Sequence, residues 1–304
     1  MNKKILVIGG TRFFGKILVQ GLLARGHHVT LATRGNAPLA FAEGEQLSHI
    51  RVDRGDRNAM HQAFKDCAGF DVIYDQVCYH PHDAHIACEV FAEKVKRYVM
   101  TSTIEVYADH YPTHTAAANE DLIDLQRVAI DIDSAWRDAA FAEANYGLAK
   151  RQAEAYFAQH AAFAFVSVRS AHVYAQNDEF TGRFAHYKNR AQQGTGFEYS
   201  EGLGKTSFIS ASNLADFLLW IGEQDFVGPI NAAANGTFSA LDLYRMAGGD
   251  GAKCKSSHTA QQPTLLSPFD YAHDYLMSTA RAHHFGYIFQ ENQLALEAVL
   301  GGPV

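Results

Sequence analysis

The stretch ILVIGGTRFFGKILVQGLLARGHHVTLATRG, residues 5–35, decides the prediction of the fold. Four apolar residues at its start, residues 5–8, predict a buried strand that runs into a glycine-rich turn. An amphipathic run then predicts a helix, and a second apolar segment at residues 29–32 predicts the next strand. Strand, tight turn, helix and strand in this order predict a βαβ unit.

The turn at residues 9–15 has the features of a phosphate-binding loop. Gly9 and Gly10 allow a tight turn and a close approach of the backbone, and Gly15 allows the helix to pack closely on the sheet. Backbone N–H groups at the start of the helix can then face phosphate oxygens. The alternative is a structural turn that binds no ligand. We predict a dinucleotide cofactor, bound by Gly9, Gly10, Thr11, Arg12, Phe13, Phe14 and Gly15.

Two arginines indicate which dinucleotide is bound. Arg34 follows the second strand, where NAD-specific folds place an acid that accepts hydrogen bonds from the ribose 2′-OH. An arginine there favours a 2′-phosphate, which Arg12 could reach from the other side. We therefore expect NADP or NAD, with NADP favoured; the alternative is that either arginine is solvated or stacks on the adenine ring. Asp56 is expected to bond the adenine amino group or to cap a helix.

Apolar strands and helical stretches alternate through the first half of the chain, which predicts an α/β fold with a parallel sheet covered on both faces. A further strand and its exit are expected at residues 163–174. A strand and an apolar helix follow at residues 206–223, and another strand at residues 228–235. We predict a sheet domain at residues 1–168, which segments near 206–235 rejoin, and a smaller C-terminal lobe formed mostly by residues 169–304. The predicted strands of the first half are Lys4–Ile8, His28–Thr33 and residues 49–51, 72–75 and 97–101; the predicted helices are residues 15–25, 57–67, 81–94 and 144–160.

A tyrosine and a lysine at helical spacing suggest acid–base chemistry. Tyr146 and Lys150 lie four residues apart, on one face of a predicted helix. A nearby ammonium favours the phenolate and so lowers the pKa of a phenol. Upstream, a predicted strand ends in the hydroxyls of residues 101–103, and ligands bind at such strand ends in α/β sheets. A serine–threonine cluster that only caps a turn is the alternative.

These segments together resemble an extended short-chain dehydrogenase/reductase of the NAD-dependent epimerase/dehydratase family. The similar stretches are GGTRFFG, TSTIEVYA, YGLAK, VRSAHVYAQND and FISASNLADFLL, which span most of the chain to about residue 219. The resemblance implies a Rossmann domain with a seven-stranded, doubly wound sheet and a C-terminal substrate lobe. It makes Tyr146 the acid/base, Lys150 its pKa-lowering partner and a ribose ligand, and Thr103 the hydroxyl of the triad, with Ser102 as the nearest rival.

Three departures from that family bear on the substrate. Arg12 replaces the middle glycine of the loop, which resembles an atypical branch that includes the chloroplast stem-loop-binding proteins. Ile104 stands where nucleotide-sugar dehydratases have an aspartate, while Glu105 remains, so we do not expect a dehydratase. Thr206 stands where epimerases have a diphosphate-binding arginine, and Lys205 could substitute for it. Glu105, Lys205 and Arg183, which could face an anionic group, are the predicted substrate contacts.

Composition and the remaining motifs indicate the compartment and the partners of the protein. The net charge of −7 and the absence of an apolar run of membrane length argue against a nucleic-acid or membrane partner. Four cysteines without CxxC spacing indicate a reduced, cytoplasmic protein. His85 and Cys88 could share a metal, but surface histidines at a helix start are favoured, and we predict no metal. Relatives pair through helices that correspond to residues 81–94 and 144–160, which implies a homodimer.

The sequence therefore predicts an NAD(P)-dependent oxidoreductase or epimerase. Its substrate would be a small molecule with a secondary alcohol or ketone, such as a sugar or a nucleotide-sugar-like compound. The alternative is a non-catalytic nucleotide-binding or RNA-associated protein, similar to the chloroplast stem-loop-binding proteins.

Overall fold

A computed structural model describes residues 2–36, 40–42, 44–111, 116–257 and 265–301. The chain forms two compact units. The first, here called the sheet unit, comprises Met1–Ala108, Glu120–Ser170 and Leu214–Asn231, and the second unit comprises Asp109–Asn119, Ala171–Asn213 and Ala232–Val304. The chain thus leaves the sheet unit after Ser170 and returns to it at Leu214.

The sheet unit is built on a seven-stranded sheet with the order β10-β6-β5-β4-β1-β2-β3. The neighbouring strands from β6 to β3 in this order pair in parallel, which confirms the predicted doubly wound α/β fold. All of β1 after Lys4 is buried, because helices cover both faces of the sheet. The strands are β1 (Lys4–Ile8), β2 (His28–Thr33), β3 (Leu47–Arg51), β4 (Phe70–Asp75), β5 (Val95–Thr103), β6 (Ala164–Ser170) and β10 (Gly228–Ala232).

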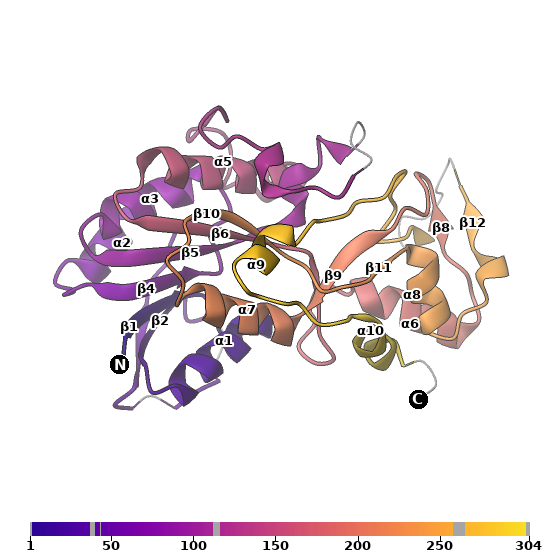
Figure 1. The fold of residues 1–304 in the computed structure, drawn as a ribbon, viewed down its shortest axis with the longest axis horizontal. Helices are drawn as coiled ribbons and strands as arrows, with labels where there is room; N and C mark the ends of the chain where they lie inside the picture. Colours follow the sequence, from indigo (N-terminus) through magenta and orange to yellow (C-terminus); the bar gives the residue numbers. More distant parts are fainter. Residues whose placement is uncertain (1, 37–39, 43, 112–115, 258–264, 302–304) are drawn as a thin grey trace. The chain divides into compact units, whose positions relative to one another are not determined.

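Two layers of helices cover this sheet (Figure 1). On one face lie α2 (Arg57–Phe64), α3 (Pro81–Phe91) and α5 (Tyr146–His160), which pack over an apolar core. On the other face lie α1 (Phe13–Ala24) and α7 (Ala211–Ile221), which meet where Gly21 leaves room for Leu219. The short helix α4 (Ala139–Ala144) precedes α5, and the two are separated at Asn145, so the helix predicted from residue 144 begins at Tyr146.

The order of the strands locates a ligand site. From β1 the chain builds outward through β2 and β3, and it then crosses to β4 on the other side of β1 and continues through β5 and β6. In open α/β sheets, ligands bind at the carboxyl ends of the strands where this direction changes. That point lies between the ends of β1 and β4, so the glycine loop and the residues that follow Asp75 both belong to it.

A fully buried ion pair joins α5 to the sheet. Arg169 on β6 donates to both carboxylate oxygens of Glu154 on α5, with an Nη2–Oε2 distance of 2.7 Å and no solvent exposure of either side chain. Arg169 also donates to the Tyr107 hydroxyl, which donates in turn to the side chain of Asn231 on β10. The carboxylate of Glu120 accepts from the Asn231 backbone. The 3-10 helices η1 (Ile104–Tyr107) and η3 (Glu120–Leu122) are thereby tied to the same network.

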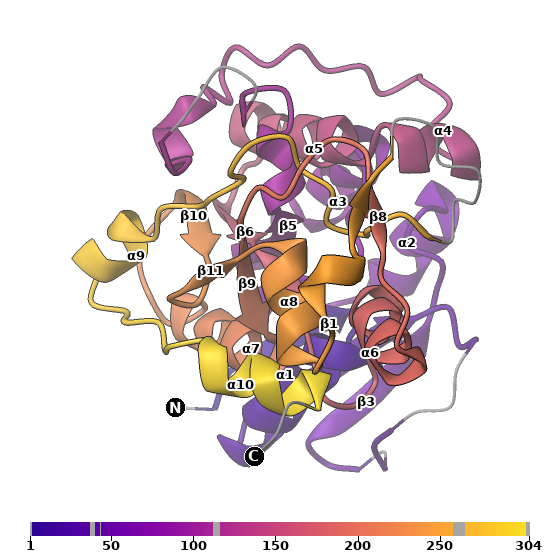
Figure 2. The ribbon, with the colours of Figure 1, turned by 90° about the vertical axis from the view of Figure 1, so that its right-hand side faces the viewer.

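A segment of the chain covers the outer side of α5. Residues 123–138, called the strap, run over α5 before α4 begins (Figure 2). The Gln126 side chain donates to the Ala158 carbonyl at 3.0 Å, and the Gln159 side chain donates to the Leu125 carbonyl at 2.8 Å. The backbone N–H of Asp131 in the strap donates to the Gln152 side chain. As a result, no residue from 149 to 159 is exposed.

The second unit has an aromatic core and two small sheets. One sheet has the order β11-β9-β7, and β12 pairs with β8 in the other. The strand and exit predicted at residues 163–174 divide at Ala171, so that β6 and β7 lie in different sheets. The elements of this unit are β7 (His172–Tyr174), α6 (Arg183–Gln193), β8 (Glu198–Tyr199), β9 (Thr206–Ser210), β11 (Thr237–Phe238), α8 (Ala240–Met246), η4 (Gly251–Lys253), β12 (Lys255–Ser256), α9 (Ala280–His284) and α10 (Gln293–Leu300).

We expect Glu154→Gln to lower the free energy of unfolding by about 3–5 kcal/mol, because it leaves the guanidinium of Arg169 buried and uncompensated. The matched control is Glu223→Gln, which removes the exposed ion pair with Arg25 and is expected to cost less than about 1 kcal/mol. Urea unfolding followed by circular dichroism measures both values. Equal losses in the two variants would show that the buried pair contributes nothing beyond an exposed one.

Candidate active site

The glycine loop has the backbone that close approach to a ligand requires. Gly9 and Gly10 have positive φ angles of 92° and 81°. A Cβ on Gly10 would lie 2.8 Å from the Val7 side chain, and a Cβ on Gly15 would lie 2.8 Å from the Gly10 Cα. The loop therefore packs directly on the first turn of α1, and the N-cap residue of that helix, Arg12, makes no side-chain cap hydrogen bond. The residues of this loop therefore fit a phosphate group, which backbone N–H groups at the start of the helix would bind.

The structure explains how an arginine can replace the middle glycine. Arg12 has φ −138° and ψ 162°, an extended conformation that any residue can adopt, and its side chain is exposed. The next residue, Phe13, takes the left-handed conformation instead, with φ 54°. A bulky residue in this region carries backbone strain, which the buried packing of the Phe13 side chain must offset.

A second arginine accompanies Arg34, and the sequence analysis missed it. Arg34 is exposed directly after β2, and its carbonyl accepts a hydrogen bond of 3.1 Å from the Arg51 side chain at the end of β3. The Arg51 side chain lies against Gly35, where a Cβ would approach its Nε to 2.6 Å. Two cationic side chains thus gather at the carboxyl ends of β2 and β3. The pairing of Thr33 with Arg51 in the register could have indicated this.

Asp56 caps a helix, as the alternative interpretation had it. Its carboxylate accepts from the backbone N–H of Ala59 at 3.0 Å and so begins α2. Its contact with adenine remains a prediction. Asp53 is also exposed and lies closer to the end of β3, where its carboxylate accepts from the Gly55 backbone.

Backbone packing brings the predicted catalytic residues of the sheet unit together. Gly147 lies so close to η1 that a Cβ would approach the Glu105 carbonyl oxygen to 2.2 Å, which fixes the first turn of α5 beside the end of β5. Thr103 is the last residue of β5, and its hydroxyl accepts from the Glu105 backbone at 3.3 Å. Tyr146 and Lys150 lie on the first turn and a half of α5. Tyr146 is 37% exposed, whereas Lys150 is buried and donates to the Thr101 carbonyl at 2.8 Å.

Tyr79 belongs to this group of residues, although the sequence analysis did not identify it. It follows β4, and its ring lies 4.8 Å from the Lys150 ammonium. Burial raises the pKa of Tyr79, an effect that the charge of Lys150 opposes. Its position in the exit of the fourth strand was the available signal, but the contact with Lys150 arises only from the packing of α3 against α5.

A buried charge network supports the loop that carries Tyr79. Arg54 pairs with Asp75 at the end of β4 and with Asp83 on α3, at 3.0 Å for the latter. Burial alone would lower the pKa of Arg54, but the two carboxylates outweigh it and raise this pKa well above its ordinary value. Burial raises the pKa of the neighbouring Cys78 thiol, which is therefore not a nucleophile at neutral pH.

The histidines of the segment where a metal was the disfavoured alternative make other contacts. His85 shares a hydrogen bond of 2.7 Å with the Tyr156 hydroxyl, and His80 caps α3 by accepting from the Asp83 backbone. Within the described ranges, no group of three or more histidine, cysteine or acidic side chains could hold a metal ion.

In the second unit, Arg183 begins α6 and lies beside a buried histidine. The Arg183 Nη1 is 3.3 Å from His172 Nδ1, and the Tyr271 hydroxyl is 3.0 Å from His172 Nε2. Because a guanidinium can only donate, Nδ1 must accept, and the ring proton therefore resides on Nε2. Burial and the charge of Arg183 lower the pKa of His172 well below 6.5.

The other residues at the predicted diphosphate position divide between surface and interior. Lys205 has an exposed side chain, and its backbone N–H donates to Asp274 at 2.9 Å. Thr206 is buried, and its hydroxyl donates to the Tyr275 carbonyl. Of the two, only Lys205 presents its side chain to solvent.

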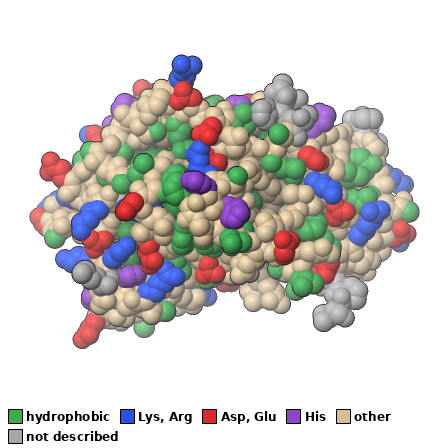
Figure 3. Space-filling model, in the orientation of Figure 1, with side chains coloured by type: hydrophobic (Ala, Val, Ile, Leu, Met, Phe, Trp, Pro, Cys, Tyr) green, Lys and Arg blue, Asp and Glu red, His purple; other side chains and the backbone are tan. Residues whose placement is uncertain are grey.

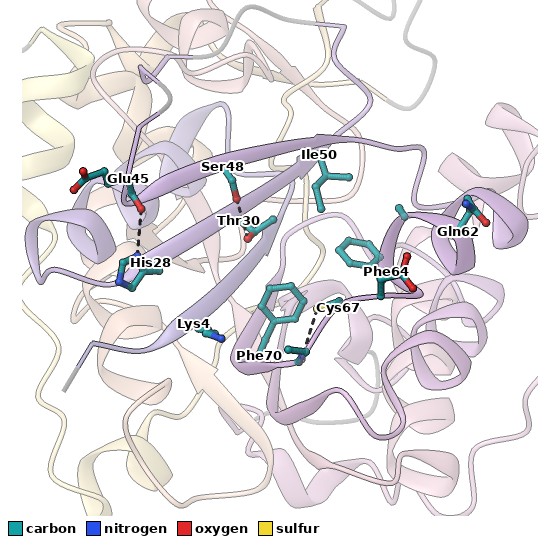
Figure 4. Close-up of a pocket in the computed structure, with 14 residues that line it drawn as sticks. Lys4, His28, Thr30, Glu45, Ser48, Ile50, Gln62, Phe64, Cys67 and Phe70 are labelled. Atoms are coloured by element: carbon teal, nitrogen blue, oxygen red, sulfur yellow. Dashed lines mark hydrogen bonds between the residues drawn. The ribbon is translucent and has the colours of Figure 1, made fainter.

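The sheet unit also has a surface cavity of about 610 Å³. Figure 4 shows Lys4, His28, Thr30 and Ser48 on one side of it and the end of α2 on the other, with a Thr30–Ser48 hydrogen bond of 3.1 Å in its wall. None of its lining residues is a predicted site residue. The cavity is therefore not part of the candidate site.

Residues 5–233 match the NAD dependent epimerase/dehydratase family. The chain belongs to this family. The match covers the strands and helices of the sheet unit and those of the second unit as far as β9, and it confirms the predicted resemblance.

Two curated proteins match this chain over shorter segments. The chloroplast stem-loop binding protein of 41 kDa b from Arabidopsis thaliana is 34% identical over 117 residues, which are 35% of this chain and 30% of that protein. The 2′-dehydrokanamycin reductase from Streptomyces kanamyceticus is 29% identical over 141 residues, which are 44% of this chain and 39% of that protein. The matches thus span about a third of the length of these relatives.

Solved structures of epimerases share the fold over nearly the whole chain. UDP-glucose 4-epimerase from Thermotoga maritima matches with a TM-score of 0.71 and 15% identity, covering 98% of this chain and 97% of that one. UDP-glucuronic acid 4-epimerase from Bacillus cereus, solved with UDP-glucuronic acid and NAD, gives 0.70 and 17%, with 98% of each chain covered. At this level of identity the likeness establishes the fold, including the predicted Rossmann sheet.

We expect the His172 ring to remain neutral, with its proton on Nε2, at pH values just below 6.5, where an ordinary histidine becomes protonated. Its folded pKa lies below the unfolded value of 6.5, so the unfolded chain binds the proton first as the pH falls. His172 therefore contributes stability above about pH 6.5 that is lost progressively at lower pH. Two-dimensional NMR of the ring nitrogens, assigned with His172→Gln, measures this. A protonated ring above pH 6 would contradict the assigned hydrogen bonds.

Proposed function

We propose that this protein is an NAD(P)-dependent enzyme that transfers a hydride to or from a secondary alcohol or ketone carbon. One observation carries the proposal: Gly147, next to Tyr146 at the start of α5, packs on Glu105 of η1, the 3-10 helix that directly follows Thr103 at the carboxyl end of β5. Membership of the NAD dependent epimerase/dehydratase family supports it. The glycine loop, with its positive φ angles and its contact between Gly10 and Gly15, fits the dinucleotide.

When bound, the nicotinamide supplies or accepts the hydride. In the direction of reduction, the Tyr146 phenol donates its proton to the carbonyl oxygen while the hydride reaches the carbon, and in oxidation the phenolate removes that proton. The buried ammonium of Lys150 stabilises the phenolate. The Thr103 hydroxyl already accepts from the Glu105 backbone, so its own proton is available to hold the substrate oxygen.

The cofactor preference follows from the charges at the carboxyl ends of β2 and β3. Arg34 and Arg51 lie there, and a guanidinium binds a phosphate through charge-assisted hydrogen bonds. We propose NADP as the preferred cofactor. A preference for NADP favours a reductase that releases its cofactor after each turnover over an epimerase, and the partial match to a reductase agrees with this.

The substrate contacts are proposed from their charge. Glu105 follows Thr103 in η1 and would accept hydrogen bonds from substrate hydroxyls. In the second unit, Arg183 and the exposed Lys205 would bind an anionic or strongly polar group. A sugar or a sugar-nucleotide-like ketone combines both features.

The RNA-associated alternative has the stem-loop binding relative in its favour. The charge of the chain argues against it, because a net charge of −7 repels phosphate backbones. Figure 3 shows basic and acidic side chains intermingled on the face drawn, without a continuous basic stripe. In the described parts of the chain, no helix is long and apolar enough to cross a bilayer.

A homodimer remains a prediction, and the strap bears on its geometry. The implied interface consists of the outer sides of α3 and α5, but the strap already occupies that side of α5. We propose that any dimer of this protein uses the strap or another surface in place of α5 itself.

We expect Tyr146→Phe to reduce turnover at least about 100-fold and to leave cofactor affinity within about twofold, because it removes only the proton-transferring oxygen. The test follows NADPH oxidation with a panel of keto sugars and cofactor binding by calorimetry. Tyr156→Phe, ten residues and almost three turns further along α5, is the matched control and should keep full turnover. Equal activity of Tyr146→Phe and the parent would refute the role assigned to Tyr146.

We expect Arg34→Ala to weaken NADPH binding at least about tenfold and NADH binding less than about threefold, because the charge-assisted hydrogen bond to the 2′-phosphate is lost. Calorimetry with both cofactors measures the ratio. Lys96→Ala removes a positive charge from the amino end of β5, at the opposite end of the strands, and should change neither affinity. Equal losses for the two cofactors would instead point to stacking on adenine.

A further inference from the structure

The ring of Tyr79 covers the ammonium of Lys150. The distance from Nζ to the ring centroid is 4.8 Å, within the range of a cation–π interaction. The same ammonium donates to the Thr101 carbonyl at 2.8 Å from another direction. The lysine is therefore held by a backbone oxygen at the end of β5 and by an aromatic face supplied by the β4–α3 connection.

The loop that presents Tyr79 is fixed by buried charges. The backbone N–H of Tyr79 donates to Asp83 at 2.9 Å, and Asp83 also pairs with Arg54. Asp75, at the start of the connection, accepts from the Val77 backbone at 2.9 Å. Both ends of this short connection are thus anchored to carboxylates that share one buried guanidinium.

The ring itself remains partly open to solvent. Tyr79 is 48% exposed, whereas Lys150 is only 2% exposed, so the ring lies on the solvent side of the ammonium. Removing the ring would allow water to reach the lysine and would free its long side chain. The charged and titratable groups near Tyr79 are Lys150, Tyr146, Asp75 and Asp83.

We propose that Tyr79 is a positioning residue for Lys150: its aromatic face holds the ammonium in place and excludes water from it, so that the ammonium acts on Tyr146. The inference rests on the proposed function, which makes Tyr146 the proton-transferring group. The aromatic face performs this role, and the Tyr79 hydroxyl is dispensable for it. An ordinary phenol is already protonated at neutral pH, and the pKa of Tyr79 is raised further by partial desolvation, so its phenol does not compete with Tyr146 as a base.

The test compares Tyr79→Phe, which keeps the ring, with Tyr79→Leu, which removes it. Tyrosine labelled with ¹³C at Cζ reports the pKa of Tyr146 directly, and the Tyr146→Phe spectrum assigns the signal; no substrate is needed. We expect the pKa of Tyr146 to rise by about one unit in Tyr79→Leu and to stay unchanged in Tyr79→Phe, because only the first change exposes the ammonium to water. Tyr156→Leu, which removes a ring from the same helix, should leave it unchanged.

A second measurement checks the contact itself. The Cε protons of Lys150 should show a ring-current shift in the parent and in Tyr79→Phe that disappears in Tyr79→Leu; Tyr79→Met replaces the leucine variant if that variant does not fold. An unchanged Tyr146 pKa after loss of the ring-current shift would overturn the proposal. If the pKa moves as expected but Tyr146→Phe retains full turnover, the positioning role stands and the proposed function fails.

Discussion

Arg169 and Glu154 form an ion pair that solvent does not reach, and the docking of α5 on the sheet depends on it. Two charges in such a place are tolerated only when they meet with good geometry, because an unpaired buried charge is costly. The pair therefore admits one position of α5 along β6. The Tyr107 hydroxyl and Asn231 extend the network to η1 and β10, so the helix and the end of β5 are fixed by the same set of hydrogen bonds.

The first half of the fold was accessible from the sequence because each strand is a short buried run between helices. The strand bounds predicted for β1 and β2 are confirmed, whereas β3, β4 and β5 extend beyond their apolar centres. The added residues lie at the starts of β3 and β4 and at both ends of β5, where the strands continue beyond the predicted segments. The single strand and exit expected at residues 163–174 divide at Ala171, where the chain passes from one unit to the other.

The sequence predicts the candidate site only where its residues lie close together along the chain. The glycine loop and the Tyr146–Lys150 pair are visible as motifs, because their members are close in sequence. Tyr79 and Arg51 acquire their meaning from neighbours on other elements, and no local pattern predicts such contacts. The sequence allows Asp56 either to cap a helix or to contact adenine. The hydrogen bond from Ala59 establishes the capping role.

Side chains of α5 hold the strap in place mainly through hydrogen bonds to backbone atoms of the strap. Gln152 accepts from the Asp131 N–H, and Gln159 donates to the Leu125 and Val128 carbonyls. Since every residue type offers the same carbonyl, and all but proline the same N–H, these hydrogen bonds do not depend on the strap's side chains, and only buried ones such as Ile123, Leu125 and Trp136 restrict its sequence. On the helix, by contrast, the same hydrogen bonds depend on the side chains of Gln152 and Gln159, so a substitution there would release the strap where a substitution at residue 128 or 131 would not.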